Sequence, residues 1–344
     1  MSDQKSSREA YYKDIAPHNL TPLWEVFKDL VVPEPKTRAV PAIWHYDQIR
    51  DSIMKSGDLI TAKEAIRRVL ILENPGMPGE SKITNSLYAG LQLILPGEVA
   101  PAHRHTQSAL RFIVEGSGAY TAVEGEKTIM QPGDFVITPS WTWHDHGNDS
   151  AEPMVWLDGL DIPIVASVDA SFAEESTAER QELTRPTGDT LARYGSGMMP
   201  VGYEHVTRTS PVFSYPYSRT REALEKMRES EEWDACHGLK LQFTNPVTGD
   251  YAMATIGTFM QLLPKGFQTA PYRSTDGMVF SVVEGSGSVT ISGNTYAWGP
   301  RDTFVVPAWH HSELSAAEDA VLFSFSDRPV QDKLGLWRED RGNH

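Results

Sequence analysis

The chain has 344 residues, 40% of them hydrophobic and 22% charged, which is enough for two medium-sized domains with their own cores. The net charge of −15 argues against nucleic acid and anionic membranes as partners, and apolar runs such as 69–72 are too short to span a bilayer. The N-terminus has no apolar targeting region, and a single cysteine, Cys236, excludes an intrachain disulfide, so we expect a reducing, cytoplasmic setting.

Residues 1–80 are expected to form a helical arm. The segment 21–32, TPLWEVFKDLVV, has helical apolar spacing behind a threonine cap, with proline as the first helical residue. The segment 61–72, TAKEAIRRVLIL, begins with Thr61 and has Glu64 three residues later, which is the pattern of a capping box.

The texture changes along the rest of the chain. Residues 81–165 read as short strands that are bounded by turns and rich in Thr, Val, Ile and Trp. Residues 166–240 form a charged, partly helical linker, with its clearest helix at 220–233. Strands return over 241–328, and a polar tail, 329–344, follows.

The two strand regions are related to one another. The segment 111–141 resembles 279–309 in its apolar pattern, its glycines and its prolines, and VEGSG occurs at both 114–118 and 283–287. Two unrelated domains that share a chance pentapeptide would not agree over such a length. This internal duplication of many short strands predicts a mainly β protein of two small barrels.

Two histidine pairs stand in the first copy. His103 and His105 are two residues apart, so on a strand both imidazoles lie on one face, and His144 and His146 have the same spacing. A lone histidine is usually a satisfied core or surface residue. Three or four imidazoles that converge inside one barrel instead indicate a metal site.

The first pair resembles the first motif of the cupin family, Gly-x5-His-x-His-x(3,4)-Glu-x6-Gly. Gly97, His103, His105 and Gly116 match that motif, whereas its glutamate falls on Ala109. The carboxylate ligand of the family is therefore missing.

The second pair resembles the second cupin motif, Gly-x5-Pro-x-Gly-x2-His-x3-Asn. Gly133, Pro139, His144 and Asn148 match, with Trp141 in place of the glycine. The resemblance implies that the two histidines of the first motif and His144 bind the metal. It also implies a bicupin fold of two jelly-roll barrels, with an N-terminal helical arm and a helical linker.

The second copy is degenerate at the ligand positions. Tyr272, Ser274 and Ser312 stand where the first copy has its three ligands, and His310 and His311 are out of register. We expect one metal site, in the N-terminal barrel, and a structural C-terminal barrel that serves oligomer contacts or closes the pocket.

Three imidazoles without a thiolate suit Zn, Fe, Cu or Ni, and three histidines also hold zinc in hydrolytic sites. Without the glutamate a divalent ion keeps its full charge and up to three of about six coordination positions. An aromatic acid that chelates through carboxylate and hydroxyl, together with O2, fits such a site. This favours ring-cleaving dioxygenation with one Fe(II) per subunit.

Longer segments are similar to gentisate 1,2-dioxygenases, a family that includes salicylate and 1-hydroxy-2-naphthoate dioxygenases. The likeness covers most of the chain, including NSLYAGLQLILPGEVAPAHRHTQSALRF, TPSWTWHDHGN, HNLTPLWEVF, RRVLILENPGM and YPYSRTREAL. It implies cleavage of gentisate with O2 to maleylpyruvate, and a homotetramer. The alternatives are salicylate or 1-hydroxy-2-naphthoate as substrate, a zinc or manganese isomerase or hydrolase, and a non-catalytic storage or sensor protein.

Several residues are candidates for binding the substrate. Arg111 follows the histidine pair and stands between apolar neighbours, so on a buried strand its cation would pair with a substrate carboxylate. The alternative is an ordinary surface arginine. Arg67 or Arg68 would supply a second cation, and the resemblance favours Arg67. Gln92 and Tyr88 share one strand face; a buried Gln92 needs a hydrogen-bond partner, and Tyr88 would pack on the ring.

Further residues are expected around the metal. Gln107 would support the histidine pair. His146 is the candidate base or hydrogen-bond partner for a second ring hydroxyl, and Asp158 would orient its ring. The alternative for Asp158 is a turn residue without a role in the site. Trp141 and Trp143 are pocket walls or barrel core.

Overall fold

The computed structural model describes residues 2–204, 206–229 and 232–342. The chain divides into two units, Met1–Lys36 and Thr37–His344. Within the described ranges, none of the helices combines the length and apolar character that a membrane crossing requires.

The first unit contains α1 (Ser2–Ile15), a 3-10 turn η1 (Ala16–His18) and α2 (Leu23–Leu30). The predicted helix is present, but its predicted threonine cap is wrong: Pro22 occupies the N-cap position, and no side chain caps the helix. Much of the apolar surface of α2 is exposed to solvent, at Leu23, Trp24, Phe27 and Leu30.

The second unit opens with four short elements: β1 (Ala42–Trp44), α3 (Tyr46–Leu59), α4 (Ala62–Ala65) and β2 (Val69–Ile71). The predicted cap of α4 is confirmed, because the hydroxyl of Thr61 accepts from the Glu64 amide at 3.1 Å. The prediction that this helical pattern continues to residue 72 is wrong. Ile66 takes φ 58°, which ends the helix, and the apolar residues that follow pair with a barrel strand as β2.

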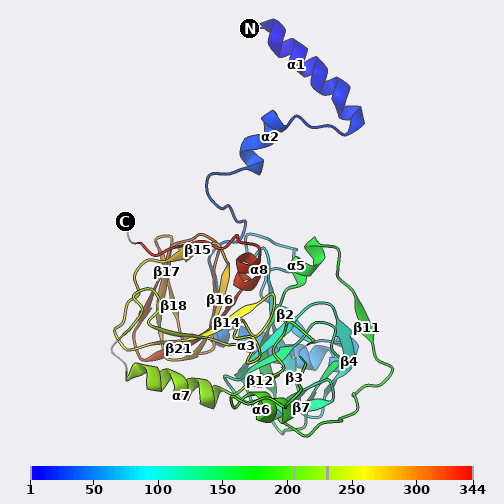
Figure 1. Ribbon diagram of the computed structural model, residues 1–344, viewed down its shortest axis with the longest axis vertical. Helices are drawn as coiled ribbons and strands as arrows, with labels where there is room; N and C mark the ends of the chain where they lie inside the picture. The colour runs from blue at the N-terminus through cyan, green and yellow to red at the C-terminus, as the bar shows by residue number, and fades with distance from the viewer. Residues whose placement is uncertain (1, 205, 230–231, 343–344) are drawn as a thin grey trace. The chain divides into compact units, whose positions relative to one another are not determined.

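The N-terminal barrel consists of two antiparallel sheets (Figure 1). Their strands run in the orders β12-β8-β5-β10-β3-β2 and β11-β4-β9-β6-β7, so the segment after the barrel supplies an edge strand to each sheet. The bounds are β3 (Tyr88–Ile94), β4 (Val99–His105), β5 (Ala109–Glu115), β6 (Ala119–Val123), β7 (Glu126–Ile129), β8 (Phe135–Thr138), β9 (His144–Asn148), β10 (Met154–Leu160), β11 (Ala173–Glu175) and β12 (Ser214–Tyr215).

The C-terminal barrel repeats this arrangement. Its larger sheet has the order β1-β19-β16-β21-β14-β13, which matches the first barrel position by position, and β18-β17-β20 form its smaller sheet. The predicted duplication and the bicupin architecture are confirmed. The bounds are β13 (Leu239–Gln242), β14 (Gly257–Leu263), β16 (Met278–Glu284), β17 (Gly287–Ile291), β18 (Asn294–Trp298), β19 (Thr303–Val306), β20 (Ser312–Ala316) and β21 (Ala320–Ser326).

The remaining elements lie between the barrels, within the second barrel segment and after it. The helix predicted at 220–233 is α7, which covers Tyr217–Arg228. The tail contains a short helix and a short strand. The bounds of the others are α5 (Ile162–Ser167), α6 (Asp189–Tyr194), β15 (Arg273–Ser274), α8 (Arg328–Lys333) and β22 (Glu339–Asp340).

The larger sheets of the two barrels pack on one another through apolar side chains. Phe112 and Phe323 stack at 4.1 Å between ring centroids, and Phe135 packs against Phe323 at 5.7 Å. All three belong to one buried cluster with residues from both barrels. Apolar burial therefore joins the copies into one body.

Helix α3 ties the barrels together. The Tyr46 hydroxyl donates to Glu115 of the N-terminal barrel at 2.8 Å, and the Arg50 guanidinium donates to the same carboxylate at 2.6 Å. The Tyr46 amide, at the helix start, donates to Asp302 of the C-terminal barrel at 2.8 Å. One helix is thus fixed to both copies.

Helix α7 repeats these contacts with the barrels exchanged. Tyr217 and Arg221 donate to Glu284 at 2.5 and 3.2 Å, and the Tyr217 amide donates to Asp134 at 2.8 Å. The glutamate of each VEGSG copy is therefore the anchor of one bridging helix. The duplication includes this helix contact as well as the barrel.

Candidate metal centre and substrate site

Three histidines meet inside the N-terminal barrel. Strands β4 and β9 are antiparallel neighbours in which His103 stands opposite His144, and His105 is the next residue on the same face. Ring centroids are 4.3 to 5.2 Å apart, and one ligand atom from each ring lies within 4.8 Å of the others. In the described part of the chain, no other group of three metal-ligating side chains comes together in this way.

Backbone carbonyls orient these rings. The Nδ1 atom of His105 lies 2.8 Å from the Gln107 carbonyl, and that of His144 lies 2.9 Å from the Thr142 carbonyl. His103 makes the same contact at 3.2 Å with the carbonyl two residues before it. Each ring thereby directs Nε2 away from the backbone, and His144 Nε2 is buried without a partner. A metal ion would supply that partner, so the residues present fit one.

Burial keeps the three imidazoles neutral. It lowers the pKa of His103 to about 3, with a further decrease from the Arg67 guanidinium, and the pKa of His105 to about 4. The pKa of His144 lies well below its ordinary value for the same reason. Neutral imidazole is the form that ligates a cation. Ala109, at the glutamate position of the cupin motif, is buried and adds no charge.

Trp141 keeps the backbone shape that the motif glycine provides. Its φ is 61°, in the left-handed region, and its amide donates to the His105 carbonyl at 2.8 Å. The equivalent Trp309 of the second copy has φ 62°. The rings of Trp141 and Trp143 are only partly buried, and both lie against the Arg104 guanidinium, at 4.5 and 4.7 Å. They pack on this cation and not in the barrel core.

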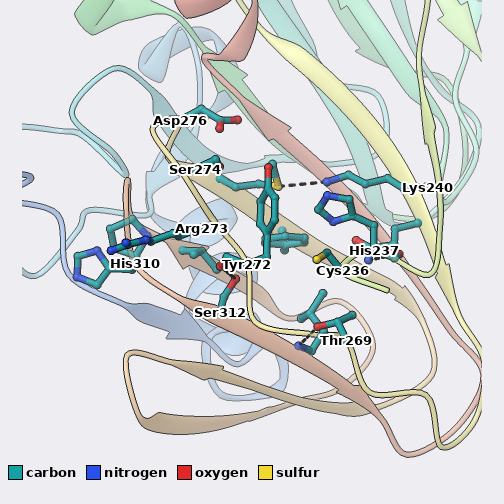
Figure 2. A pocket seen from close by; sticks show the side chains of 16 residues that line it. Cys236, His237, Lys240, Thr269, Tyr272, Arg273, Ser274, Asp276, His310 and Ser312 are labelled. Atoms are coloured by element: carbon teal, nitrogen blue, oxygen red, sulfur yellow. Dashed lines mark hydrogen bonds between the residues drawn. The ribbon is translucent and has the colours of Figure 1, made fainter. Parts of the chain in front are cut away.

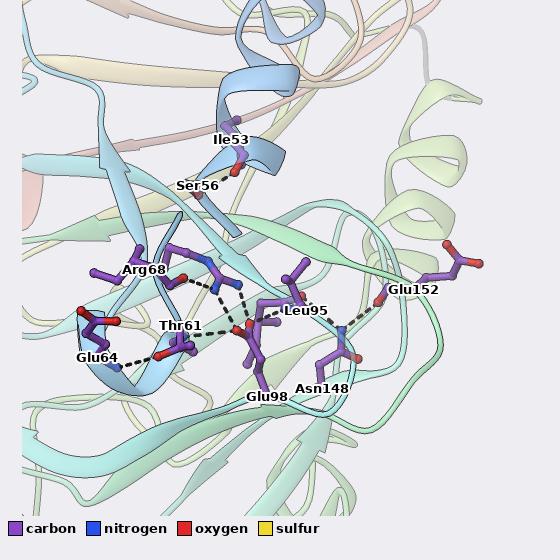
Figure 3. Close-up of polar contacts among 12 residues, drawn as sticks. Ile53, Ser56, Thr61, Glu64, Arg68, Leu95, Glu98, Asn148 and Glu152 are labelled. Atoms are coloured by element: carbon purple, nitrogen blue, oxygen red, sulfur yellow. Dashed lines mark hydrogen bonds and ion pairs between the residues drawn. The ribbon is translucent and has the colours of Figure 1, made fainter. Parts of the chain in front are cut away.

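Arg67 and Arg68 point to different surroundings. Arg68 is buried and forms an ion pair with Glu98, and it also donates to the Ile60 carbonyl at 2.8 Å (Figure 3). Arg67 lies at the metal centre, with Nη2 2.5 Å from His103 Nδ1. The Arg68 guanidinium is therefore already bound to Glu98 and a backbone carbonyl, whereas Arg67 faces the histidines.

The Arg67 contact depends on the state of His103. A guanidinium only donates, so this contact requires a lone pair on Nδ1. Coordination through Nε2 requires a hydrogen on Nδ1, which the carbonyl at 3.2 Å would accept. Arg67 must therefore leave Nδ1 when His103 binds a metal.

Arg111 is a buried cation on β5. Its Nη1 donates to the Thr138 hydroxyl at 2.5 Å, and its Nη2 donates to His146 Nε2 at 2.9 Å. Asp158 stands opposite it on β10, with Nε to Oδ1 at 3.7 Å. Burial lowers the pKa of Arg111, and burial followed by the charge of Arg111 lowers the pKa of Arg67 to about 9. The two cations share a region that is short of negative charge.

The predicted pairing of His146 with Asp158 is wrong. The Asp158 carboxylate accepts from Trp156 Nε1 at 3.0 Å and faces Arg111, whereas His146 holds Arg111 on Nε2 and the Thr121 hydroxyl on Nδ1, at 2.9 Å each. Burial raises the pKa of Asp158 to about 6, against the opposing effect of Arg111. Because Arg111 donates to Nε2, the hydrogen of His146 resides on Nδ1 and Thr121 fixes this tautomer.

The other predicted residues lie on β3 and beside the histidine pair. The Tyr88 hydroxyl lies over Gly90 of the same strand face, where an added Cβ would meet it at 3.0 Å. Gln92 is 2% exposed, and among the described residues its side chain has no hydrogen-bond partner. Gln107 orients His105 through its carbonyl, while its side chain donates to Ser171 at 2.6 Å.

Sequence reasoning missed Thr121 and Thr138. Both are inward residues of barrel strands whose hydroxyls hold His146 and Arg111. Threonine is common in strands for its shape, so neither position carries a signal in the sequence. Only the facing of β6 with β9, and of β5 with β8, identifies them.

In the C-terminal barrel, Tyr272 and Ser312 pair through their backbones, at 3.0 and 2.8 Å, as His103 and His144 face one another in the first barrel. The alignment of the degenerate positions is therefore confirmed. His310 lies two residues before Ser312, the counterpart of His144, and its Nδ1 lies 3.1 Å from the Ala308 carbonyl.

Comparison with known proteins places this centre in a family. A cupin domain model matches residues 90–160. Gentisate 1,2 dioxygenase 1 of Aquipseudomonas alcaligenes is 58% identical over 334 residues, which cover 97% of this chain and 96% of that protein. The chain belongs to the gentisate 1,2-dioxygenase family.

Other relatives extend the family to neighbouring ring acids. A 5-aminosalicylate 1,2-dioxygenase of Comamonas sp. is 35% identical and covers 96% of this chain and 89% of its own length. The crystal structure of salicylate 1,2-dioxygenase from Pseudoaminobacter salicylatoxidans, described as adducts with gentisate, superposes with a TM-score of 0.92 at 34% identity, over 98% of this chain and 94% of that one. The gentisate 1,2-dioxygenase family thus shares the whole bicupin chain.

Proposed function

We propose that this protein is an iron-dependent gentisate 1,2-dioxygenase, which opens the ring of 2,5-dihydroxybenzoate with O2 to give maleylpyruvate. Both atoms of O2 enter the product, and the ring supplies the electrons, so no external reductant is required. The high identity to a gentisate dioxygenase over nearly the full chain supports the substrate.

The observation that carries the proposal is the charge of the site. Three neutral imidazoles stand beside two arginines, and the charge of Arg111 disfavours that of Arg67. Asp158 is the one acidic group in ion-pair contact with Arg111 among the described residues. A divalent ion would add to this excess of positive charge. A substrate bearing a carboxylate and an ionised hydroxyl compensates it.

Arg111 and Arg67 bind the substrate carboxylate in this proposal. Arg111 is ordered before the substrate binds: Nη1 stays on Thr138, and only Nη2 exchanges His146 for the carboxylate. Arg67 becomes available when His103 coordinates through Nε2. Bidentate pairing of guanidinium with carboxylate orients the ring as well as holding it.

His103, His105 and His144 would hold the iron, which supplies activation of O2 and of the chelated ring hydroxyl. Tyr88 packs against the ring, and Gln92 supplies the hydrogen bond for a polar group of the substrate. Gln107 supports His105 through its carbonyl.

His146 receives the proton of the second ring hydroxyl in this proposal. Its tautomer leaves the lone pair on Nε2, which Arg111 occupies at 2.9 Å. When Arg111 turns to the carboxylate, Nε2 is free to accept from the 5-hydroxyl. Asp158 then balances the charge of Arg111, and it does not orient the imidazole. Loss of that proton raises the electron density of the ring that is to be cleaved.

The test is anaerobic loading with Fe(II), metal analysis, and an oxygen electrode assay with gentisate and salicylate side by side. We expect one iron per chain, stoichiometric O2 uptake with gentisate and a maleylpyruvate absorbance. A His103→Ala variant is expected to lose iron, and a variant that kept both iron and activity would contradict the assignment.

The relatives named for salicylate and 5-aminosalicylate favour a second candidate, in which the same site opens salicylate or 1-hydroxy-2-naphthoate. The 5-substituent separates these cases. If His146 accepts the 5-hydroxyl proton, gentisate is the better substrate, because salicylate has no group at that position.

Two further expectations complete the proposal. We propose a homo-oligomer, a tetramer by the resemblance, and the exposed apolar residues of α2 support an interface between copies. A cytoplasmic location stays a prediction from the single cysteine.

A further inference from the structure

The C-terminal barrel has an open interior where the N-terminal barrel has its histidines. A cavity of about 30 Å³ lies there, with Tyr272, Ser274 and Ser312 among its lining residues (Figure 2). These are the three positions at which the first copy carries its ligands. A cavity of this size holds roughly two water-sized groups. The second copy has therefore lost the metal ligands without filling the space with apolar side chains.

Lys240 brings into this cavity a positive charge that has no direct ion-pair partner. Its side chain extends from β13 into the pocket toward Tyr272 (Figure 2). The ammonium donates to the Met278 sulfur at 3.7 Å and lies 4.7 Å from the centre of the Phe259 ring. Among the described residues Lys240 forms no direct ion pair, and Asp276 of the same pocket is the carboxylate that acts most on its charge. A thioether is a weak acceptor, so the charge is poorly compensated.

The other basic groups of the pocket do not share this state. Arg273 is paired with Asp340 at 3.0 Å and stacks on Trp309 at 4.5 Å, and Figure 2 shows it directed away from Lys240. Burial lowers the pKa of His237 to about 3, so its ring is neutral. Burial also lowers the pKa of Lys240, to about 8, which still leaves most of its charge at pH 7.

Two buried acceptors of the pocket lack a donor. Gln261 is 1% exposed; its Nε2 donates to the His237 carbonyl at 2.6 Å, and its Oε1 has no partner. Asp276 accepts from Trp337 at 3.0 Å through Oδ1, and its buried Oδ2 has no partner. Leaving such buried atoms without hydrogen bonds destabilises the folded state. A suitable occupant must therefore accept from Lys240 and also donate a hydrogen.

We propose that the C-terminal barrel is a metal-free binding site for one small oxyanion that carries a hydroxyl group, of the size of hydrogencarbonate. Its anionic oxygen accepts from Lys240, and its hydroxyl donates to Gln261 Oε1 or Asp276 Oδ2. A halide offers no donor, and a ring acid exceeds the cavity. The site is separate from the histidine centre and makes no contact with the ring that is cleaved.

The experiment follows thermal unfolding of the iron-loaded full chain in hydrogencarbonate or chloride at equal pH and ionic strength. The unfolding temperature of the wild type is expected to rise with hydrogencarbonate, because a ligand that binds only the folded state stabilises it. Formate lacks the hydroxyl, and we expect a smaller rise with it. An equal rise would overturn the role of the unpartnered acceptors.

Lys240→Met is the decisive variant. Whatever its unfolding temperature in chloride, it is expected to show no added rise with hydrogencarbonate, because the anion has lost its cation. Lys265→Met, at an exposed lysine of the same barrel, is the matched control and keeps the rise. Ring cleavage is unchanged in both variants.

The proposal fails if the wild type shows no rise beyond that in chloride. It also fails if Lys240→Met retains the full rise, because the anion then binds elsewhere, for example at the iron. Gln261→Leu provides an independent check that keeps the lysine. We expect about tenfold more hydrogencarbonate to be needed for the same rise in this variant.

Discussion

Two adjacent arginines are expected to respond to the same substitution in opposite ways. Arg68 is held by the fold, whereas Arg67 faces the metal centre, although nothing in their shared sequence context separates them. We compare Arg67→Met with Arg68→Met, since methionine keeps much of the length of the side chain and removes the charge. Each variant is the control for the other.

Arg68→Met is expected to destabilise the protein by about 3 kcal/mol. The Arg68 side chain is 2% exposed, and that of its partner Glu98 is 19% exposed. Without the guanidinium, Glu98 keeps only the amides of Leu95 and Ala62, at 2.7 and 3.3 Å. Removing one partner of a fully buried pair costs about 3–5 kcal/mol, and the residual exposure of Glu98 moves the estimate to the lower end.

Arg67→Met is expected to leave stability unchanged or to raise it slightly, because burial and Arg111 already disfavour its charge. Its effect falls on catalysis. A charge-assisted hydrogen bond to a carboxylate contributes about 1.5–3 kcal/mol, so kcat/KM for gentisate should fall by about 10- to 150-fold.

The assays are urea unfolding of the iron-loaded protein and initial rates of O2 uptake well below the unfolding temperature. We expect a stability loss with intact kinetics for Arg68→Met, and intact stability with a kinetic loss for Arg67→Met. If Arg67→Met unfolds as easily as Arg68→Met, or if folded Arg68→Met loses catalysis, the division of roles is refuted.

Three further predictions test the supports of the site and the fold. Thr121→Val removes the hydroxyl that fixes the His146 tautomer and should lower kcat/KM about 10-fold with unchanged iron content. Thr121→Ser keeps a hydroxyl and should have the kcat/KM of the wild type. Wild-type kinetics in the valine variant would contradict this role. Trp141→Gly should be about 1 kcal/mol more stable to urea than Trp141→Ala, since φ 61° suits glycine and both variants lose the contact with Arg104; the reverse order would show that the backbone is unstrained. Glu115→Gln should cost about 1–2 kcal/mol at neutral pH. The hydrogen bonds from the Arg50 guanidinium, despite burial, hold the pKa of the Glu115 carboxyl below 4.5. The difference in unfolding free energy between variant and wild type should therefore persist above that pH and vanish as the pH falls through the lower pKa of the folded state. A difference that is constant down to pH 3 would exclude the ion pair as its source.

The cluster of three histidines could be predicted because its signal is local. A spacing of two residues on a strand puts His103 and His105 on one face whatever the rest of the chain does. The same holds for Tyr88 and Gln92, and for the cap formed by Thr61. Each of these statements depends only on the geometry of a few consecutive residues.

The helix predicted through residue 72 fails for the opposite reason. The apolar run after Arg68 suits a helix or a buried strand equally well by its own pattern. Pairing of β2 with β3 decides in favour of the strand, because Val69 finds a partner strand at Gln92. A local preference of a few tenths of a kcal/mol per residue is easily overridden by such pairing.

The hydrogen-bond partners of His146 and Asp158 could be identified only in the folded chain. Both are inward-facing residues on barrel strands, and a direct contact between them is reasonable from their spacing alone. The tertiary structure inserts Arg111 between them and gives His146 a different second partner, Thr121. Hydrogen-bond partners across three strands depend on register and on side-chain length, neither of which the pattern records.

The sequence by itself determined the duplicated β architecture, the three-histidine centre without a carboxylate, and the loss of ligands in the second copy. These follow from repeat, periodicity and residue chemistry, which are properties of the chain before it folds. Only the tertiary structure decided which arginine faces the three histidines, and how α3 and α7 each join both barrels through the repeated glutamates. The tertiary structure also revealed the cavity at Lys240, because the sequence does not show which side chains surround this lysine.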